Sequence, residues 1–371
     1  MKTDSSRRTF LAAGLSLPAA GVVSAAAPLC RTLGKTGLKV TQVGFGCMIT
    51  SDPSVVERGI DMGITYFDTA RVYQSGNNER MVGAVLKGKR DKLVLSTKST
   101  SRKGKDALAD LETSLKLLGT DHVDIWYMHA VDDPKDVTGD LISAWETAKK
   151  QGKIRHIGIS THQPNALVDR VLQAGKFEVL LSTYNFTIGS NNDAAFDRLN
   201  KAGIGLVAMK VMAPAAREYG FKADRSGRME RPGGPLAALK WVLRNQRFAT
   251  SIPSMVDMDQ LETNMRAMSE PYAAEDAKVL ARLNEEIRPL YCRMCYQCTG
   301  HCPQGVRVPE TLRYLSYADF YGQYALGREH FLALPQAARS ARCADCGSCA
   351  VRCPNGVHVP ERLRKAQEIF A

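Results

Sequence analysis

Short apolar runs alternate with longer amphipathic stretches through the middle of this 371-residue chain. Residues 105–118, for example, place Leu108, Leu111, Leu115 and Leu118 on one helical stripe. Eight runs have the length and composition of buried strands: residues 41–45, 65–68, 93–97, 123–128, 156–160, 179–183, 205–209 and 250–252. Eight strand–helix units in about 250 residues predict an α/β fold, a (β/α)8 TIM barrel.

Polar side chains stand where three successive expected strands end, which is where a barrel carries its reactive groups. Asp68 and Tyr73 follow the second strand, Lys98 ends the third and His129 ends the fourth. The motifs around them resemble the aldo-keto reductase family. The same resemblance extends to RTLGKTGLKV (31–40), NNERMVGAVL (77–86), GKIRHIGIS (152–160) and IPS (252–254), which occur in the family's order.

The resemblance implies a catalytic tetrad for carbonyl reduction, which needs a hydride at carbon and a proton at oxygen. Tyr73 would be the general acid, and His129 would orient the carbonyl. A tyrosine hydroxyl has an ordinary pKa of about 10. We expect the ammonium of Lys98 to lower it and the carboxylate of Asp68 to hold that ammonium. Taken singly, an Asp at a strand end is often a cap and a lone His is often a core residue.

The resemblance also implies a nicotinamide cofactor, NAD(P), whose contacts are only partly kept. Ser160 and Asn264 retain family positions, and Lys210 is placed for a pyrophosphate or an anionic substrate, or is a solvated rim lysine. The family's other cofactor contacts are replaced by Thr161 and His162, Leu181, Met209, Ser254 and Gln260. Without Arg or Lys at the last two positions, the strongest reason to prefer NADP disappears. NAD, another binding mode or no dinucleotide remain open.

Two cysteine motifs occupy the last eighty residues. YCRMCYQCTGHCP holds Cys292, Cys295, Cys298 and Cys302, and RCADCGSCAVRCP repeats the pattern with Cys343, Cys346, Cys349 and Cys353. The repeat continues as CPQGVRVPETLR and CPNGVHVPERLR. The spacing C-x2-C-x2-C-x3-C followed by proline resembles the bacterial two-cluster ferredoxin motif.

Three cysteines in a tight loop suit three corners of one iron–sulfur cube. The ferredoxin resemblance implies that each fourth cysteine reaches the other cluster, so Cys353 would join the first trio and Cys302 the second. Structural zinc or disulfides are the alternatives, although zinc cysteines usually group as two plus two. Because residues 308–334 between the motifs show a helical pattern, we expect a small, mainly helical ferredoxin-like domain with two [4Fe–4S] clusters.

The charge and composition of the chain bear on whether its partner is a nucleic acid. The formal charge of +12 looks basic, but eight thiolates around two oxidised cubes would remove about four units. Basic residues are spread along the chain without interleaved aromatics, which argues against nucleic-acid binding.

The first thirty residues look like a targeting segment. Ser6-Arg7-Arg8-Thr9-Phe10-Leu11 resembles the twin-arginine export signal, and an alanine-rich stretch follows it. We therefore expect a periplasmic or other extracytoplasmic protein, with an uncleaved membrane anchor or a cytosolic tail as alternatives. No later segment is long and apolar enough to span a bilayer. The expected organisation is a signal at 1–30, a barrel at 31–288 and a cluster domain at 289–371.

Three functions fit this organisation. The first is an exported oxidoreductase that moves hydride between a nicotinamide cofactor and a small carbonyl or alcohol, while the clusters relay electrons to a redox partner protein. The second is an electron-transfer or binding module built on a catalytically weakened barrel. In the third, the clusters are only structural.

The cysteine pattern generates the first testable prediction. Protein purified without oxygen should be coloured and contain about eight irons per chain with matching sulfide. Assays of iron, sulfide and dinucleotide on a single sample check it. A colourless, iron-poor preparation made under the same conditions would contradict the cluster interpretation.

Overall fold

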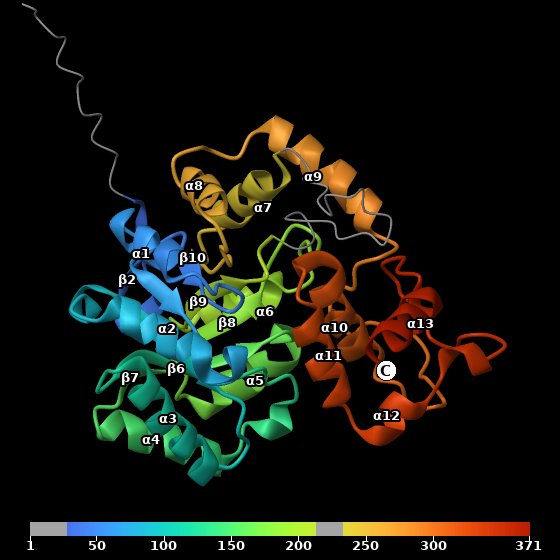
Figure 1. The fold of residues 1–371 in the computed structure, drawn as a ribbon, viewed down its shortest axis with the longest axis horizontal. Coiled ribbons are helices and arrows are strands. Elements are labelled where there is room, and N and C mark those ends of the chain that lie inside the picture. The colour runs from blue at the N-terminus through green and yellow to red at the C-terminus, as the bar shows by residue number, and fades with distance from the viewer. Residues whose placement is uncertain (1–27, 213–232) are drawn as a thin grey trace, which may run out of the picture.

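The computed structural model describes residues 28–212 and 233–371, and the predicted signal lies outside that range (Figure 1). Its centre is a sheet of eight parallel strands in the spatial order β10-β9-β8-β7-β6-β5-β4-β3. The strands are β3 (Phe45–Gly46), β4 (Tyr66–Asp68), β5 (Val94–Ser99), β6 (Val123–Met128), β7 (Ile154–Thr161), β8 (Val179–Thr183), β9 (Gly205–Met209) and β10 (Phe248–Ser251). The barrel expected from the apolar runs is confirmed.

The expected first strand, 41–45, is shorter in the structure. Thr41 ends β2 (Lys39–Thr41), which pairs with β1 (Cys30–Thr32) in an antiparallel hairpin. The chain after it closes the barrel instead. Gly44 N donates to Ser251 O at 2.8 Å, and Ser251 N donates to Gln42 O at 2.9 Å. These bonds join the two edges of the sheet.

Helices surround the strands and bury their outward-facing side chains (Figure 1). The helical stripe expected at 105–118 is confirmed as α3. The helices of this part are α1 (Pro53–Asp61), α2 (Asn77–Leu86), α3 (Gly104–Leu118), α4 (Gly139–Lys150), α5 (Pro164–Ala174), α6 (Asp193–Lys201), α7 (Gly234–Leu243), α8 (Met258–Arg266) and α9 (Ala274–Ile287). Trp126 and Trp145 stack between β6 and α4 with ring centroids 3.7 Å apart.

The barrel interior is apolar near the hairpin and polar toward the opposite end. Leu33 and Val40 pack with inward residues of the strands. Above them, Tyr66 donates to Ser96 Oγ at 3.0 Å, and Ser96 donates to Asp68 Oδ1 at 2.6 Å. This chain of hydrogen bonds leads to the carboxylate at the end of β4.

The C-terminal region is helical, as the sequence predicted, and lies against the barrel (Figure 1). It contains α10 (Val308–Tyr321), α11 (Tyr324–Leu332), α12 (Gln336–Ser340) and α13 (Val359–Phe370). The helical stretch expected at 308–334 is two helices, because Gly322 adopts a left-handed conformation at φ 64° and ends α10. Phe331 and Phe370 pack α11 against α13.

Across the ranges 28–212 and 233–371, no helix combines the length and the apolar character required to cross a bilayer.

Tight packing between α2 and α3 generates a stability prediction. A Cβ added at Gly83 would lie 2.4 Å from the backbone oxygen of Leu118, so Gly83→Ala should force the helices apart and cost roughly 1–3 kcal/mol. Gly139→Ala, at the start of α4, meets nothing within 4 Å and should be neutral or slightly stabilising. Unfolding midpoints of the two variants give the comparison. Equal midpoints would contradict the close approach.

Candidate active site and cluster-binding region

One buried ammonium joins three of the four predicted catalytic residues. Lys98, in β5, donates to Asp68 Oδ2 at 2.5 Å, to Thr69 O at 2.7 Å and to Tyr73 Oη at 3.2 Å. Lys98 and Asp68 are each 1% exposed. Because an ammonium has three protons, these contacts use all of them. The phenol accepts from Lys98, and its own proton is therefore free for another acceptor.

Burial and the neighbouring charges shift the pKa values of Tyr73 and Lys98. Burial raises the pKa of Tyr73, the nearby Lys98 lowers it, and the net result is a pKa of about 12. Burial also lowers the pKa of Lys98, but Asp68 and Tyr73 raise it by more. The expectation that Lys98 lowers the pKa of Tyr73 is right in direction, yet burial outweighs it. At neutral pH the pair is a phenol beside an ammonium, which suits a proton donor.

His129, directly after β6, completes the predicted tetrad. Its ring meets that of Tyr73 edge to face, with centroids 5.8 Å apart. Burial, and then the charge of Lys98, hold its pKa well below the ordinary value, so the imidazole is neutral. Nδ1 has no hydrogen-bond partner among the described residues. A neutral imidazole beside the phenol can donate a hydrogen bond to a carbonyl oxygen without competing for its proton.

Asp68, Tyr73 and His129 line a cavity of about 840 Å³, a size usual for small-molecule sites. Its walls come from the strand ends and from the segment before α8. Its roof comes from the C-terminal region: Arg313, Tyr314, Tyr317, Phe320 and Tyr321 of α10, Gly322 and Gln323, and Leu326, Glu329 and His330 of α11. The sequence predicted these helices but not their place over the barrel.

The predicted cofactor residues share this cavity. Ser160, Lys210 and Asn264 all line it, together with the divergent positions Leu181, Met209, Ser254 and Gln260. Ser160 Oγ accepts a hydrogen bond from the Ala130 amide at 2.8 Å. Lys210 Nζ donates to Tyr317 Oη of α10 at 3.3 Å, so this lysine contacts the C-terminal region.

An ion-pair network holds the roof to the barrel. Arg313 of α10 lies 3.3 Å from Asp132 Oδ2 and 3.0 Å from His162 Nδ1. Asp132 Oδ1 also accepts from the His162 amide at 2.7 Å. Burial lowers the pKa of His162 to about 4, against the opposing charge of Asp132, so this imidazole is neutral. His162 stands where the family resemblance loses its Ser-Asn pair, and here it serves the contact between the two regions.

The two cysteine motifs are bound to each other symmetrically. Thr299 N donates to Arg352 O and Arg352 N donates to Thr299 O, both at 3.0 Å. After each Cys-Pro pair a glycine turns the chain with positive φ, 77° at Gly305 and 85° at Gly356, and a helix follows. Glycine is suited to that conformation, which accounts for its recurrence in both repeats.

The surroundings of the thiols show which cysteines are neighbours. Burial, followed by the charges of Cys298, Cys295 and Cys353, raises the pKa of Cys292 to about 12. Around Cys343 the neighbouring thiols are Cys302, Cys349 and Cys346. Each trio therefore lies near the fourth cysteine of the other motif. All eight are free thiols, and six pack against an apolar group of valines and leucines.

Eight free thiols in this region have the chemistry that iron–sulfur clusters need. Among the described residues, no three Cys, His, Asp or Glu side chains form a group that could hold a single metal ion. A four-iron cube instead needs thiolates spread around its corners. The amide of Asn355 donates to Cys295 Sγ at 3.3 Å, a kind of contact that tunes cluster potentials.

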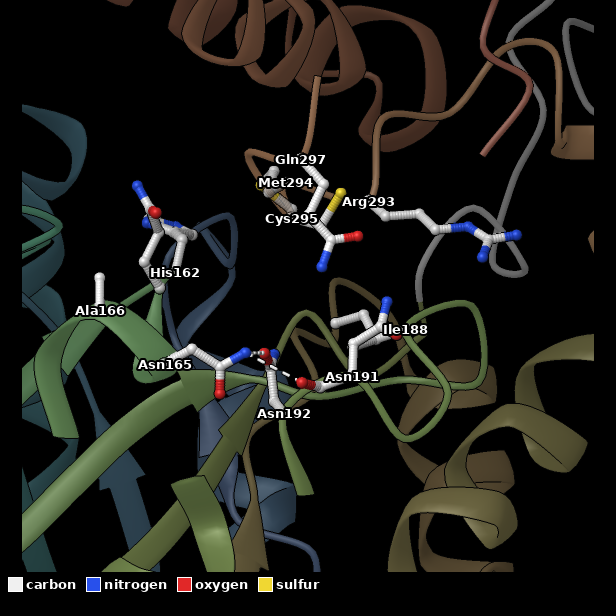
Figure 2. A pocket seen from close by; sticks show the side chains of 11 residues that line it. His162, Asn165, Ala166, Ile188, Asn191, Asn192, Arg293, Met294, Cys295 and Gln297 are labelled. Atoms are coloured by element: carbon white, nitrogen blue, oxygen red, sulfur yellow. Dashed lines mark hydrogen bonds between the residues drawn. The ribbon is translucent and has the colours of Figure 1, made fainter. Parts of the chain in front are cut away.

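A small pocket of about 40 Å³ separates the first cysteine loop from the barrel. Figure 2 shows His162, Asn165 and Asn192 of the barrel side facing Arg293, Cys295 and Gln297 of the cysteine loop. His162 lines this pocket and also the large cavity. One imidazole thus lies between a predicted cluster ligand and the candidate active site.

Sequence reasoning missed the residues that join the two regions: Asp132, His162 as a contact residue, Arg313, Tyr317 and His330. Their signal was weak. The sequence pattern predicted that the aromatic and basic residues of α10 lie in a helix. It did not predict which face of that helix contacts the barrel.

Comparisons with known proteins agree with this geometry. The aldo/keto reductase family profile matches residues 52–232, and the 4Fe-4S dicluster domain profile matches residues 291–358. The chain is 25% identical over 278 residues to the uncharacterized oxidoreductase YqkF of Bacillus subtilis, covering 64% of this chain and 90% of that protein. It is 25% identical over 320 residues to the L-glyceraldehyde 3-phosphate reductase of Escherichia coli, covering 69% and 92%.

Solved structures show the same fold. The holo form of an aldo-keto reductase from Bacillus halodurans matches with a TM-score of 0.60 and 26% identity, over 69% of this chain and 96% of that one. An aldo-keto reductase from Klebsiella pneumoniae in complex with NADPH matches with a TM-score of 0.57, over 69% and 95%. At 22% identity, the second match concerns the fold alone.

The Arg313–Asp132 contact generates a prediction about docking. Arg313→Gln and Asp132→Asn should each destabilise the folded protein by roughly 1–3 kcal/mol, because each leaves a partly buried charge without its partner. The double variant should lose less than the sum of the two. Thermal unfolding of the cluster-loaded protein measures this coupling.

The exposed pair Arg198–Asp169 supplies the matched control, since its side chains are 51% and 69% exposed. Neutralising either partner there should change stability by less than about 0.5 kcal/mol. Additive effects at Arg313 and Asp132 would show that the two side chains do not interact in solution.

Proposed function

We propose that this chain, an oxidoreductase of the aldo-keto reductase type that also carries a 4Fe-4S dicluster domain, transfers hydride between a nicotinamide dinucleotide and a small carbonyl or alcohol. Its cluster region relays the electrons to a redox partner protein. The observation that carries the proposal is the ammonium of Lys98, bonded to both Asp68 and Tyr73 in a cavity that the cluster-bearing helices roof.

The residues of the cavity supply the proton chemistry. In the reductive direction hydride adds to the carbonyl carbon, the π electrons pass to oxygen, and that oxygen takes the phenol proton of Tyr73. Lys98 stabilises the phenolate that remains, while His129 donates a hydrogen bond that holds the carbonyl in place. The oxidation of an alcohol uses the same groups in reverse. A nicotinamide dinucleotide, when bound, supplies or accepts the hydride.

Ser160 and Asn264 are the residues expected to hold the dinucleotide, and we propose that NAD is preferred over NADP. Asp257 and Asp259 line the cavity near the family's 2′-phosphate positions. Gln260, at one of those positions, is already bonded to Asp257 at 2.7 Å. Carboxylates there would repel an additional phosphate, whereas a ribose hydroxyl can donate to them.

We propose two [4Fe–4S] clusters, one held by Cys292, Cys295, Cys298 and Cys353 and the other by Cys343, Cys346, Cys349 and Cys302. Such clusters exchange single electrons. When an alcohol is oxidised, the reduced dinucleotide would be reoxidised by giving one electron to each of the two clusters and releasing a proton. The position of His162 beside both Cys295 and the cavity supports a relay over a purely structural role.

Export through the twin-arginine pathway is part of the proposal and rests on residues 1–30 of the sequence. That pathway moves folded proteins, so clusters and a bound dinucleotide would travel with the chain. The relatives named above, together with the L-galactose dehydrogenase of Arabidopsis thaliana at 27% identity, include proteins named for a phosphorylated aldehyde and a sugar. Both fall within the proposed substrate class.

Tyr73→Phe tests the proposal. Removing the phenol oxygen should lower turnover of aldehydes by about 10²–10⁴-fold while leaving the iron content unchanged, because the hydroxyl is the proton donor and lies apart from the cysteines. Steady-state assays with NADH and NADPH on the full-length, cluster-loaded protein give the result.

Tyr324→Phe is the matched control, since this tyrosine of α11 is 49% exposed and bonds Ile369 O outside the cavity. It should keep full activity. If Tyr73→Phe keeps both turnover and electron transfer to an artificial acceptor, the barrel is a scaffold and the electron-transfer module is the better description.

A further inference from the structure

The roof of the cavity contains a second tyrosine–lysine pair. Lys210 follows β9 in a left-handed conformation, with φ at 54°. Asn185 holds this turn by donating to the Lys210 carbonyl at 3.0 Å. The turn brings Nζ to 3.3 Å from Tyr317 Oη and 4.7 Å from the centre of its ring. A non-glycine residue in this conformation costs free energy, and such strain often accompanies a functional position.

The positive charge of Lys210 is uncompensated within the described part of the chain. The other cations at or beside the cavity have carboxylate partners: Asp68 for Lys98, Asp132 for Arg313 and Glu270 for Arg266. Among the ion pairs of residues 28–212 and 233–371, none involves Lys210, whose contacts are a phenol and two aromatic faces. Within these two ranges, the ammonium of Lys210 therefore has no carboxylate in ion-pair contact.

Titratable neighbours respond to this charge. Burial lowers the pKa of His330 to about 4, with Arg313 and Lys210 acting in the same direction. Burial raises the pKa of Tyr317, but Lys210 and Arg313 outweigh it and the net direction is down. The histidines around the cavity are consequently neutral. Lys210 and Arg313 thus both bring positive charge to the part of the roof around Tyr317 and His330, which favours a bound anion there.

We propose that Lys210 and Tyr317 bind an oxyanion of the substrate, a carboxylate or a phosphate, and so select small carbonyl compounds that carry a negative charge. Tyr317 lines the same cavity as Tyr73. The oxyanion would thus sit near the reacting carbonyl. The identification of the bound anion as a substrate rests on the proposed function. The existence of an anion-binding site at Lys210 and Tyr317 is independent of that function.

Paired aldehydes test the selection on the full-length, cluster-loaded enzyme. One pair is succinic semialdehyde and butanal, for the carboxylate, and the other is glyceraldehyde 3-phosphate and glyceraldehyde, for the phosphate. The wild type should favour the charged member of at least one pair in kcat/KM. Lys210→Gln should reduce that preference about 10- to 100-fold, as expected for lost charged hydrogen bonds. Lys210→Arg should restore part of it.

Lys176→Gln is the matched control, because it removes the same charge from an exposed residue that pairs with Glu146. It should leave the preference intact. Three outcomes would overturn the proposal: no preference in the wild type, an equal loss for charged and neutral aldehydes in Lys210→Gln, or a loss confined to the affinity for the dinucleotide. The last would assign Lys210 to the cofactor's pyrophosphate.

A binding measurement keeps the anion site testable even if no aldehyde is reduced. Calorimetric titration of succinate and of inorganic phosphate into the dinucleotide-free protein should show saturable binding of at least one in the wild type, weakened about 10-fold or more in Lys210→Gln. Tyr317→Phe should weaken it less, since the ammonium remains. Saturable binding without turnover would refute the proposed reaction and retain the site, whereas its absence would refute the site.

Discussion

The active-site end of this molecule depends on keeping one buried ammonium charged. An isolated cation in the interior would lose several kcal/mol of solvation, so Lys98 is tolerable only with a carboxylate beside it and acceptors for its remaining protons. Asp68, Thr69 and Tyr73 supply these. Behind them, Ser96 and Tyr66 continue the hydrogen bonds into the barrel. A polar network inside an otherwise apolar barrel therefore places the phenol where a substrate can meet it.

The C-terminal region carries the cysteine motifs and also forms part of this cavity. Helices α10 and α11 roof the barrel, the Arg313–Asp132–His162 network holds α10 in place, and His162 borders the cysteine loop. Contacts of this kind exclude water from the cavity and strengthen the electrostatic interactions inside it. Because α10 follows the first cysteine loop directly in the chain, a movement of that loop would also move the residues of α10 that line the cavity.

The internal repeat shows how one sequence pattern takes two roles. Arg313 and Tyr317 of α10 correspond, 51 residues on, to Arg364 and Glu368 of α13. Both helices begin after the same Cys-Pro-x-Gly turn, yet α10 faces the barrel and carries the roof residues. Helix α13 packs on α10 instead, where Arg362 forms an ion pair with Asp319 at 2.5 Å. The two repeats therefore share the same turn and helix, and the residues that differ between them give α10 the face that contacts the barrel.

The sequence alone determined the barrel from local periodicity and the two cysteine motifs from their spacing, and the family resemblance of the motifs at the strand ends pointed to Asp68, Tyr73, Lys98 and His129. It did not reveal the roof. Lys210 and Tyr317 are separated by 107 residues, and Arg313 and Asp132 by 181. Nothing local records such pairs, since only the docking of two packed regions brings them together. The pKa of Tyr73 was also decided by the tertiary structure. The sequence predicted that Lys98 would lower this pKa, but burial in the folded protein raises it by more.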